Sequence, residues 1–458
     1  MVGNRARKAG FGFATIGMLA ILTACGGSQS SSEQSSGAAS SVASSAASSA
    51  ASSAPDGETQ EITLWHYEAP DSAMGKAWAK AIEVFESENP GVKVKYEPQS
   101  FETLRANAKV ILTGNEVPDV MEFNKGSDTG QLASQGLLTP LTEQAKSFGW
   151  DQKLSSPSVQ VLSKYNEQGV PGSGEWFGIP NYGEYILAYY NKDYFANNGL
   201  EVPITRAGFN DLLAQIKASG TTPICAAAKD FPYIHSWFQG VLAKAPADWV
   251  DNYQLFKGPV DFSAPYWTEG TAEAQKWATE YSTPDLTGVS HEDMGTNFIA
   301  EKCPIMITGS WWFGRLTDNA KFDWGTFVLP EQNLNQGSVG NLWTIPTNSD
   351  NKELAAKFID VTLRPEIQGI LDEAGGLSLA GSPESITDPR TKQFTEEFQK
   401  LVKENRLALY PDFPVPGFYE VMLSLSQSVA KGEKSPEEII NGVADFYNEG
   451  RAAIESGQ

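Results

Sequence analysis

The alternation of short apolar segments with amphipathic ones over residues 62–123 is the feature that most constrains the fold. Residues 62–65, 92–96 and 119–123 have the short apolar or alternating patterns of strands. Residues 74–85 and 104–112 carry apolar side chains at the three-to-four spacing of helices. Strand–helix–strand–helix–strand order predicts a parallel sheet with right-handed crossovers. Ligands bind beyond the carboxyl ends of such strands, which here means residues 65–68 and 123–128.

The same alternation continues through the middle of the chain and predicts an α/β fold for the 458-residue protein. Helices are predicted from Thr205 to Ile216 and over 271–281, and strands over 223–226, 304–307 and 324–329. The C-terminal part is predicted to be helical, with a capping box of Asp350 and Glu353 at one helix start and a second start signal at residues 435–438, where Pro436 takes the first helical position.

The first 24 residues have the pattern of a secretory signal peptide. Three basic residues precede an apolar stretch over 11–22 that is too short to span a bilayer. The signal ends in Leu-Thr-Ala before Cys25, which resembles a bacterial lipobox. We therefore expect Cys25 to be lipidated and to become the mature N-terminus. An ordinary signal with a chance cysteine is the alternative.

Residues 25–57 are expected to form a tether between the lipid and a folded body. Positions 26–57 contain 14 Ser and 8 Ala. Such a composition cannot bury enough apolar surface to offset the entropy of ordering it. A flexible chain of this length has a reach of roughly 30 Å.

Composition excludes several classes of protein. There are 34 Lys and Arg against 56 Asp and Glu, a net charge of -22. This acidity argues against a nucleic-acid partner, since nucleic-acid binders present basic surfaces. No apolar run reaches the roughly 18 residues of a membrane span. The chain has only three histidines, and it matches none of the metal, nucleotide or nucleophile motifs. We expect no metal, no cofactor and no catalytic residues.

Cys225 and Cys303 lie in or beside predicted strands, and a secreted location permits a disulfide between them. Two separate buried thiols are the alternative. Aromatic residues at predicted strand ends and in loops are the strongest sign of a binding site, because aromatic faces and polar groups together suit sugars. Trp311 and Trp312 are adjacent, so one can pack in the core while the other faces a cleft.

The chain resembles the family 1 extracellular solute-binding proteins of carbohydrate ABC importers, which include maltose-binding protein. The resemblance rests on the order and spacing of short segments across residues 60–450. They are residues 62–65, 85–92, 114–120, 136–141, 178–180, 189–193, 309–311, 328–330, 345–346 and 351–358.

This resemblance implies a two-lobed, type II periplasmic-binding-protein-like fold, with a mainly parallel sheet flanked by helices in each lobe. Crossing segments are expected near 178–185, 330–340 and 377–382. Lobe one would then comprise residues 58–180 and 338–378, and lobe two residues 181–337 and 379–458.

The resemblance also implies ligand contacts in this chain. Phe123 would stack on sugar, with Asn124 and Asp128 in the polar loop behind it. Glu184 would bind hydroxyl groups, and Trp311 would be the main aromatic contact of lobe two. Together with the aromatic residues at strand ends, the expected ligand-binding set is Tyr67, Glu68, Phe123, Asn124, Asp128, Tyr182, Glu184, Asp230, Trp237, Trp311, Trp312, Asn341, Trp343, Phe418 and Tyr419.

The implied function is capture of a mono- or oligosaccharide and its delivery to the permease of an ABC importer. The protein would be a monomer on the outer face of the bacterial cytoplasmic membrane, held there by its lipid alone. Two alternatives remain. A lipid-anchored glycoside hydrolase would need a pair of carboxylates across a cleft, and a surface lectin or adhesin would have a shallow exposed site.

Overall fold

The computed structural model describes residues 59–154, 157–381 and 386–456. The predicted signal peptide, the lipidated Cys25 and the tether lie outside these residues. The chain from Gly57 onward forms one compact unit. Within the described residues, every helix is too short or too polar to cross a lipid bilayer.

The first sheet is assembled from both halves of the chain. Strand β1 pairs in parallel with β2 and β3, and β12 then adds antiparallel to β3. The parallel pairing of β1, β2 and β3 confirms the prediction made from residues 62–123. In spatial order the strands are β2 (Val92–Pro98), β1 (Gln60–His66), β3 (Val120–Phe123), β12 (Leu342–Thr344) and β6 (Ile179–Pro180).

The second sheet is built around β7, which pairs antiparallel with β9, β10 and β11. Its pairing is therefore less parallel than expected, and only β8 with β9 and β11 with β13 run in parallel. The strands are β13 (Leu407–Ala408), β11 (Asn335–Ser338), β7 (Glu184–Asn191), β9 (Ile305–Gly309), β8 (Ile224–Cys225) and β10 (Trp324–Phe327). A separate small hairpin joins β4 (Lys164–Tyr165) and β5 (Glu175–Trp176).

The chain passes between the sheets at three places. It leaves β6 and enters β7 through residues 181–183, and it leaves β11 and enters β12 through residues 339–341. A third segment, near residues 377–381, follows the helices beside the first sheet. These places coincide with the three crossings that the family resemblance implies.

Helices flank the first sheet and bury aromatic side chains against it. The hydroxyl of Ser72 accepts the backbone N–H of Gly75 and starts α1, whose apolar face buries Trp78 and Phe85. Trp78 meets Trp343 of β12 edge to face, and Phe85 meets Phe358. The helices in this part are α1 (Ala73–Glu88), α2 (Phe101–Leu112), α3 (Ser127–Ser134), α4 (Thr142–Ser147), α5 (Trp150–Lys153), α6 (Pro157–Gln160), α13 (Lys352–Thr362) and α14 (Pro365–Glu373).

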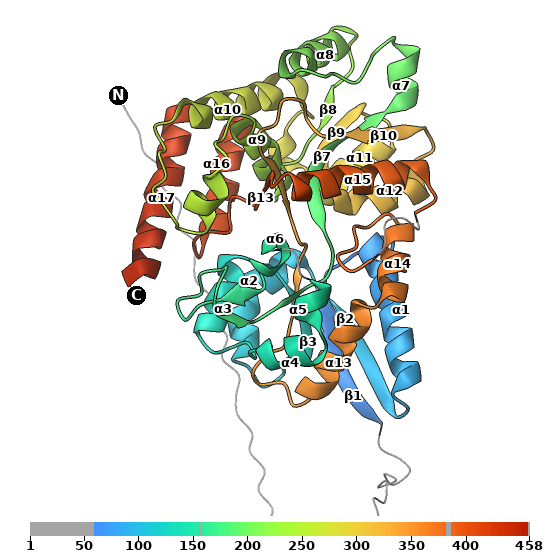
Figure 1. Cartoon of the computed structure of the whole chain (residues 1–458). Coiled ribbons are helices and arrows are strands. Elements are labelled where there is room, and N and C mark those ends of the chain that lie inside the picture. The colour runs from blue at the N-terminus through green and yellow to red at the C-terminus, as the bar shows by residue number, and fades with distance from the viewer. Residues whose placement is uncertain (1–58, 155–156, 382–385, 457–458) are drawn as a thin grey trace, which may run out of the picture. The chain divides into compact units, whose positions relative to one another are not determined.

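A larger set of helices packs around the second sheet (Figure 1). In this set α10 contacts α9, α16 and α17, and α16 contacts α9 and α17. A π-helical turn, Trp277–Tyr281, extends α10, and a 3₁₀ turn, Ser310–Trp312, joins β9 to α12. The helices are α7 (Lys192–Asn197), α8 (Arg206–Ala218), α9 (Pro232–Leu242), α10 (Pro265–Lys276), α11 (His291–Ile299), α12 (Phe313–Asn319), α15 (Pro389–Lys403), α16 (Phe418–Lys431) and α17 (Pro436–Ser456).

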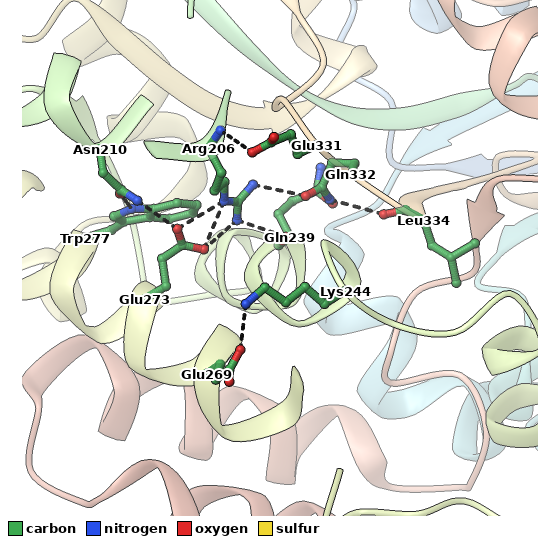
Figure 2. Close-up of polar contacts among 10 residues, drawn as sticks. All are labelled: Arg206, Asn210, Gln239, Lys244, Glu269, Glu273, Trp277, Glu331, Gln332 and Leu334. Atoms are coloured by element: carbon green, nitrogen blue, oxygen red, sulfur yellow. Dashed lines mark hydrogen bonds and ion pairs between the residues drawn. The ribbon is translucent and has the colours of Figure 1, made fainter. Parts of the chain in front are cut away.

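Arg206, the first residue of α8, ties that helix to its neighbours (Figure 2). Its guanidinium group makes a two-pronged contact with the carboxylate of Glu273 on α10, with the shortest distance 2.8 Å. It also donates to Gln332 at 3.0 Å and lies over the ring of Trp277. The neighbouring pair Lys244–Glu269 joins the segment just after α9 to α10 and is exposed to solvent.

Two predicted helix starts were wrong. The helix predicted over 271–281 begins at Pro265, because proline is favoured in the first turn. The capping box predicted at Asp350 is absent, since α13 starts one residue later and its N-cap Asn351 makes no side-chain cap bond. The helix start predicted at Ser435 is confirmed, since α17 begins at Pro436, and Ser435 and Glu438 exchange hydrogen bonds there.

The sulfur atoms of Cys225 and Cys303 lie within bonding distance, and their Cα atoms are 5.4 Å apart. That separation falls within the range that disulfides span. Cys225 belongs to β8, and Cys303 precedes β9, the strand that pairs with β8. The pair therefore lies beside a strand pairing that already joins these two segments.

Candidate functional site

A cavity of about 400 Å³ lies where residues that follow the first sheet meet residues from the second. Ligand sites of this size are normally apolar clefts with a few convergent polar groups. The lining comprises Tyr67, Glu68, Ala69, Ser72, Gln99, Ser100, Phe101, Glu102, Asn124, Lys125, Tyr182, Glu184, Asp230, Phe231, Ile234, His235, His291, Glu292, Trp311, Arg315, Asn341, Tyr410, Asp412, Phe413 and Tyr419.

Aromatic rings form a continuous part of this lining. Phe101 at the start of α2 meets Tyr67 edge to face, with ring centroids 5.2 Å apart. Phe101 also meets Phe231 at 5.8 Å, and Phe231 meets Trp311 at 6.0 Å. Rings from both sheets thus adjoin one another around the cavity.

A chain of buried hydrogen bonds runs beside the aromatic rings. The hydroxyl of Tyr182 donates to Glu68 at 3.2 Å, and the amide of Asn341 donates to the same hydroxyl at 3.2 Å. The ammonium of Lys125 donates to Asn341 at 3.4 Å and to the carboxylate of Glu184. Because these residues come from different segments, this series of hydrogen bonds connects the carboxyl ends of strands in the first sheet to Glu184, the first residue of β7.

Burial sets the protonation of the carboxyl groups here. It raises the pKa of Glu68 to about 7, an effect that nearby Glu184 reinforces and the hydrogen bond from Tyr182 opposes. Burial also raises the pKa of Glu122, which lies beside Glu68 behind the cavity lining. The pKa of Asp412 is raised to about 6 by its burial. These acids are therefore protonated more readily than surface carboxylates.

Acceptors for hydrogen bonds outnumber cations around the cavity. Six carboxylates line it, against the two cationic side chains of Lys125 and Arg315. Two of these carboxylates are paired, Glu184 with Lys125 and Glu292 with Arg315. Within the described part of the chain, Glu68, Glu102, Asp230 and Asp412 form no ion pair with lysine or arginine. Such oxygen atoms can accept hydrogen bonds from a ligand rich in hydroxyl groups.

No group of three or more His, Cys, Asp or Glu residues among those described is arranged to hold a metal ion.

Residues 69–369 match the family model described as bacterial extracellular solute-binding protein. The match covers well over half of the chain.

The chain belongs to the bacterial extracellular solute-binding protein family.

Two relatives were found by sequence. The multiple sugar-binding protein of Streptococcus mutans serotype c is 25% identical over 305 residues, which are 62% of this chain and 67% of that protein. The alpha-glucosides-binding periplasmic protein AglE of Rhizobium meliloti is 26% identical over 207 residues. That alignment covers 45% of this chain and 42% of AglE.

Solved structures share the fold at lower identity. A chitin oligosaccharide binding protein matches with a TM-score of 0.70 at 20% identity, covering 86% of this chain and all of that one. The solute-binding protein RafE, solved in complex with raffinose, matches with a TM-score of 0.65 at 20% identity, covering 85% and 99%. These likenesses show the two-lobed α/β fold that the sequence analysis predicted.

Nine of the fifteen predicted contacts of this solute-binding protein line the cavity. The structure brings together side chains from loops, from the crossing segments, from the start of β7, from the 3₁₀ turn after β9 and from the first turn of α16. They are Tyr67, Glu68, Asn124, Tyr182, Glu184, Asp230, Trp311, Asn341 and Tyr419.

Three predicted contacts lie in the core of the second sheet and its helices instead. Trp237 on α9 is fully buried and donates to the hydroxyl of Thr271. Trp312 is fully buried behind Trp311. Phe418 is the first residue of α16 and stacks on Phe446. All three side chains are fully buried, and none of them lines the cavity.

The other three lie in the first sheet and in α3, the helix that follows β3. Phe123 and Trp343 lie on β3 and β12 and point into the core. Asp128 lies behind the cavity lining, where it accepts a hydrogen bond from Asn124 at 2.9 Å and pairs with Arg105 at 2.8 Å. Phe123, predicted to stack on sugar, therefore does not line the cavity. Asp128 does not line it either, and its carboxylate instead holds the side chains of Asn124 and Arg105.

Sequence reasoning missed several lining residues. Lys125 was overlooked although it lies between two predicted contacts, and Tyr410 to Phe413 form an aromatic loop before α16 that gave no periodic signal. Phe101 and Phe231 begin or precede helices, where an aromatic ring is normally assigned to the core. The missed residues are Phe101, Glu102, Lys125, Phe231, Ile234, His235, His291, Glu292, Arg315, Tyr410, Asp412 and Phe413, with small or neutral residues beside them.

Proposed function

We propose that this protein is the sugar receptor of an ABC importer, which captures a mono- or oligosaccharide in the cavity and delivers it to a permease. The observation that carries the proposal is the lining itself: aromatic rings from both sheets adjoin carboxylates that lack cationic partners. Sugars offer C–H faces to rings and hydroxyl donors to carboxylates. The names of the two curated relatives support a sugar ligand.

We divide the body into lobe one, residues 58–180 and 338–378, and lobe two, residues 181–337 and 379–458. The membership of the strands in two sheets supports this division. A ligand that contacts both lobes favours the form in which they approach, because only that form makes all the contacts. No covalent step is part of this mechanism, and the protein acts as a monomer.

We also propose that Cys25 carries lipid and holds the protein outside the cytoplasmic membrane. Two acyl chains anchor stably, whereas one gives marginal binding. A Cys25→Ser variant should leave the membrane fraction for the medium or periplasm. Retention of that variant in washed membranes would contradict the anchor without touching the sugar-binding proposal.

The test of sugar binding is a thermal-shift screen over mono- and oligosaccharides, followed by titration calorimetry on the hits. We expect at least one sugar to raise the melting temperature in proportion to its concentration, since a ligand of the folded state stabilises it by mass action. Small-angle scattering should report a more compact protein with that sugar. Release of shorter products from an oligosaccharide would instead identify a hydrolase.

A further inference from the structure

The two adjacent tryptophans share one hydrogen-bond acceptor. The indole N–H of Trp311 donates to Nε2 of His291 at 2.9 Å, and that of Trp312 donates to the same nitrogen at 2.7 Å. Trp311 lines the cavity, whereas Trp312 is fully buried. One imidazole therefore fixes a ring of the candidate site and a ring of the core together.

The imidazole is itself held firmly. His291 is the first residue of α11, which begins with a capping box formed by Ser290 and Asp293. The carboxylate of Asp230 accepts the backbone N–H of His291 at 3.0 and 3.1 Å. The position of the ring is thus fixed by a helix start and by a carboxylate that also lines the cavity.

Space for both indoles depends on glycine. A Cβ at Gly309 would overlap the ring of Trp311, and one at Gly295 would overlap the ring of Trp312. Packing against these glycines places the faces of the two rings, and within the described residues both indole N–H groups donate to His291 alone. The hydrogen bond to His291 therefore sets which way the N–H edge of Trp311 points.

The protonation state of His291 follows from its donors. An indole N–H can only donate, so Nε2 must carry a lone pair, and the ring proton lies on Nδ1. Nδ1 is 3.5 Å from a carboxylate oxygen of Glu292. A second proton would occupy Nε2 and remove the acceptor for both tryptophans.

Charges of both signs surround the imidazole. The groups that face it from its own helix, from the loop after β8, from α9 and from α12 are Lys229, Asp230, His235, Glu292, Asp293 and Arg315.

We propose that His291 is a positioning residue that holds Trp311 in the wall of the cavity while its ring is neutral and releases it when the ring gains a proton. This inference rests on the proposed function for its biological meaning, since loss of the Trp311 contact would weaken ligand binding in acid. The geometry on which it depends needs no ligand.

The test uses the full chain labelled with ¹⁵N-tryptophan, without sugar. The indole N–H signals of Trp311 and Trp312, assigned with Trp311→Phe and Trp312→Phe, should lie downfield at pH 8 and move upfield together as the pH falls to 5. In His291→Gln, whose side-chain oxygen can accept a hydrogen bond, they should stay downfield throughout. In His291→Ala the downfield shift should be lost at both pH values.

His66→Gln is the matched control, because His66 is the last residue of β1 in the first sheet and its ring neighbours are Tyr96 and Trp343 rather than Trp311 or Trp312. It should keep the pH response of the native chain. The proposal is overturned if the two signals ignore pH, or if His291→Gln responds to pH as the native protein does. Either result would leave the sugar-binding proposal standing, and failure of the sugar screen would leave these ligand-free signals unchanged.

Discussion

The ammonium group of Lys125, just after β3 of the first sheet, donates a hydrogen bond to the carboxylate of Glu184, the first residue of β7 in the second. The side chains are 2% and 4% exposed, respectively. The hydroxyl of Ser338 on β11 donates to the same carboxylate at 3.1 Å. This ion pair therefore links both sheets next to the cavity.

Breaking that pair on one side should destabilise the protein strongly. Glu184→Gln leaves the ammonium of Lys125 buried without its counter-charge. Lys125→Met likewise leaves the carboxylate of Glu184 buried without its cation. Loss of one partner of a buried pair costs about 3–5 kcal/mol of unfolding free energy. Urea unfolding measures the loss. The double variant should lose less than the sum of the two single variants, because it buries no unpaired charge.

The control for this cycle is Lys80→Met, which removes a partner from the exposed pair Lys80–Glu83. Exposed pairs contribute about 0–1 kcal/mol, so this variant should unfold almost as the native chain does. Native-like stability of both Lys125→Met and Glu184→Gln would show that the pair does not matter to the fold.

Trp311→Ala should weaken binding of the sugar found in the screen by about 1–3 kcal/mol, the scale of a buried aromatic contact. Titration calorimetry gives the affinity, and Trp311→Phe should recover part of it. Trp65→Ala is the control, since Trp65 lies outside the cavity and donates to Glu97. Unchanged affinity in Trp311→Ala would remove this ring from the site.

The adjacent tryptophans show how far sequence reasoning reaches. Their adjacency indicates that one ring packs and the other faces a cleft, and the structure has Trp312 buried and Trp311 lining the cavity. Which ring does which depends on the 3₁₀ turn over 310–312 and on contact with Gly295, which belongs to α11 and lies 17 positions before Trp312 in the chain. Local periodicity carries no information about such contacts.

The same limit explains which other residues of the cavity could be predicted from the sequence and which could not. The parallel strands and the loops at their carboxyl ends follow from local patterns, so Glu68 and Asn124 were found. Phe123 was assigned to the site by resemblance, yet its side chain points to the core face of β3, and the ring of Phe101 from α2 lines the cavity instead. A register of alternating faces can be reversed by the pairing of distant strands such as β12, which sequence alone does not specify.

Glu68 should make the stability of the protein fall as pH rises. Its pKa in the folded protein is about 7, above the ordinary value of 4.5, so the folded state holds the proton more tightly than the unfolded state. Between these values the folded state binds more protons, and stability is lost as pH increases. Glu68→Gln has no such loss. The unfolding free energy of this variant relative to that of the native protein should therefore increase by about 1–3 kcal/mol from pH 4 to pH 8.

Chemical denaturation at a series of pH values gives that difference curve. Glu83→Gln, at an exposed carboxylate, is the control and should run parallel to the native protein. A flat difference between Glu68→Gln and the native protein would mean that Glu68 titrates alike in the folded and unfolded states.

A disulfide between Cys225 and Cys303 should protect both thiols and stabilise the fold. Alkylation of the denatured protein without reductant should leave these two cysteines unmodified, and prior reduction should expose both. Cys225→Ala with Cys303→Ala should lower the unfolding free energy by about 2–5 kcal/mol. Alkylation of both residues before reduction would identify them as separate buried thiols.

Arg206 should matter to the fold far more than its neighbour Lys244, although each pairs with a glutamate of α10 (Figure 2). The side chain of Arg206 is 13% exposed and that of Lys244 is 70% exposed. Arg206→Ala leaves Glu273 partly buried without its cation, and each hydrogen bond to a charged group contributes about 1.5–3 kcal/mol. We therefore expect a loss of about 2–4 kcal/mol in the free energy of unfolding by urea, against less than about 0.5 kcal/mol for Lys244→Ala.

Arg206→Lys should recover little of this stability, because an ammonium cannot reproduce the two-pronged contact with Glu273 together with the bond to Gln332. Equal losses in Arg206→Ala and Lys244→Ala would show that burial does not decide the strength of these pairs. Sugar affinity should stay native in Lys244→Ala, since neither Lys244 nor Glu269 lines the cavity.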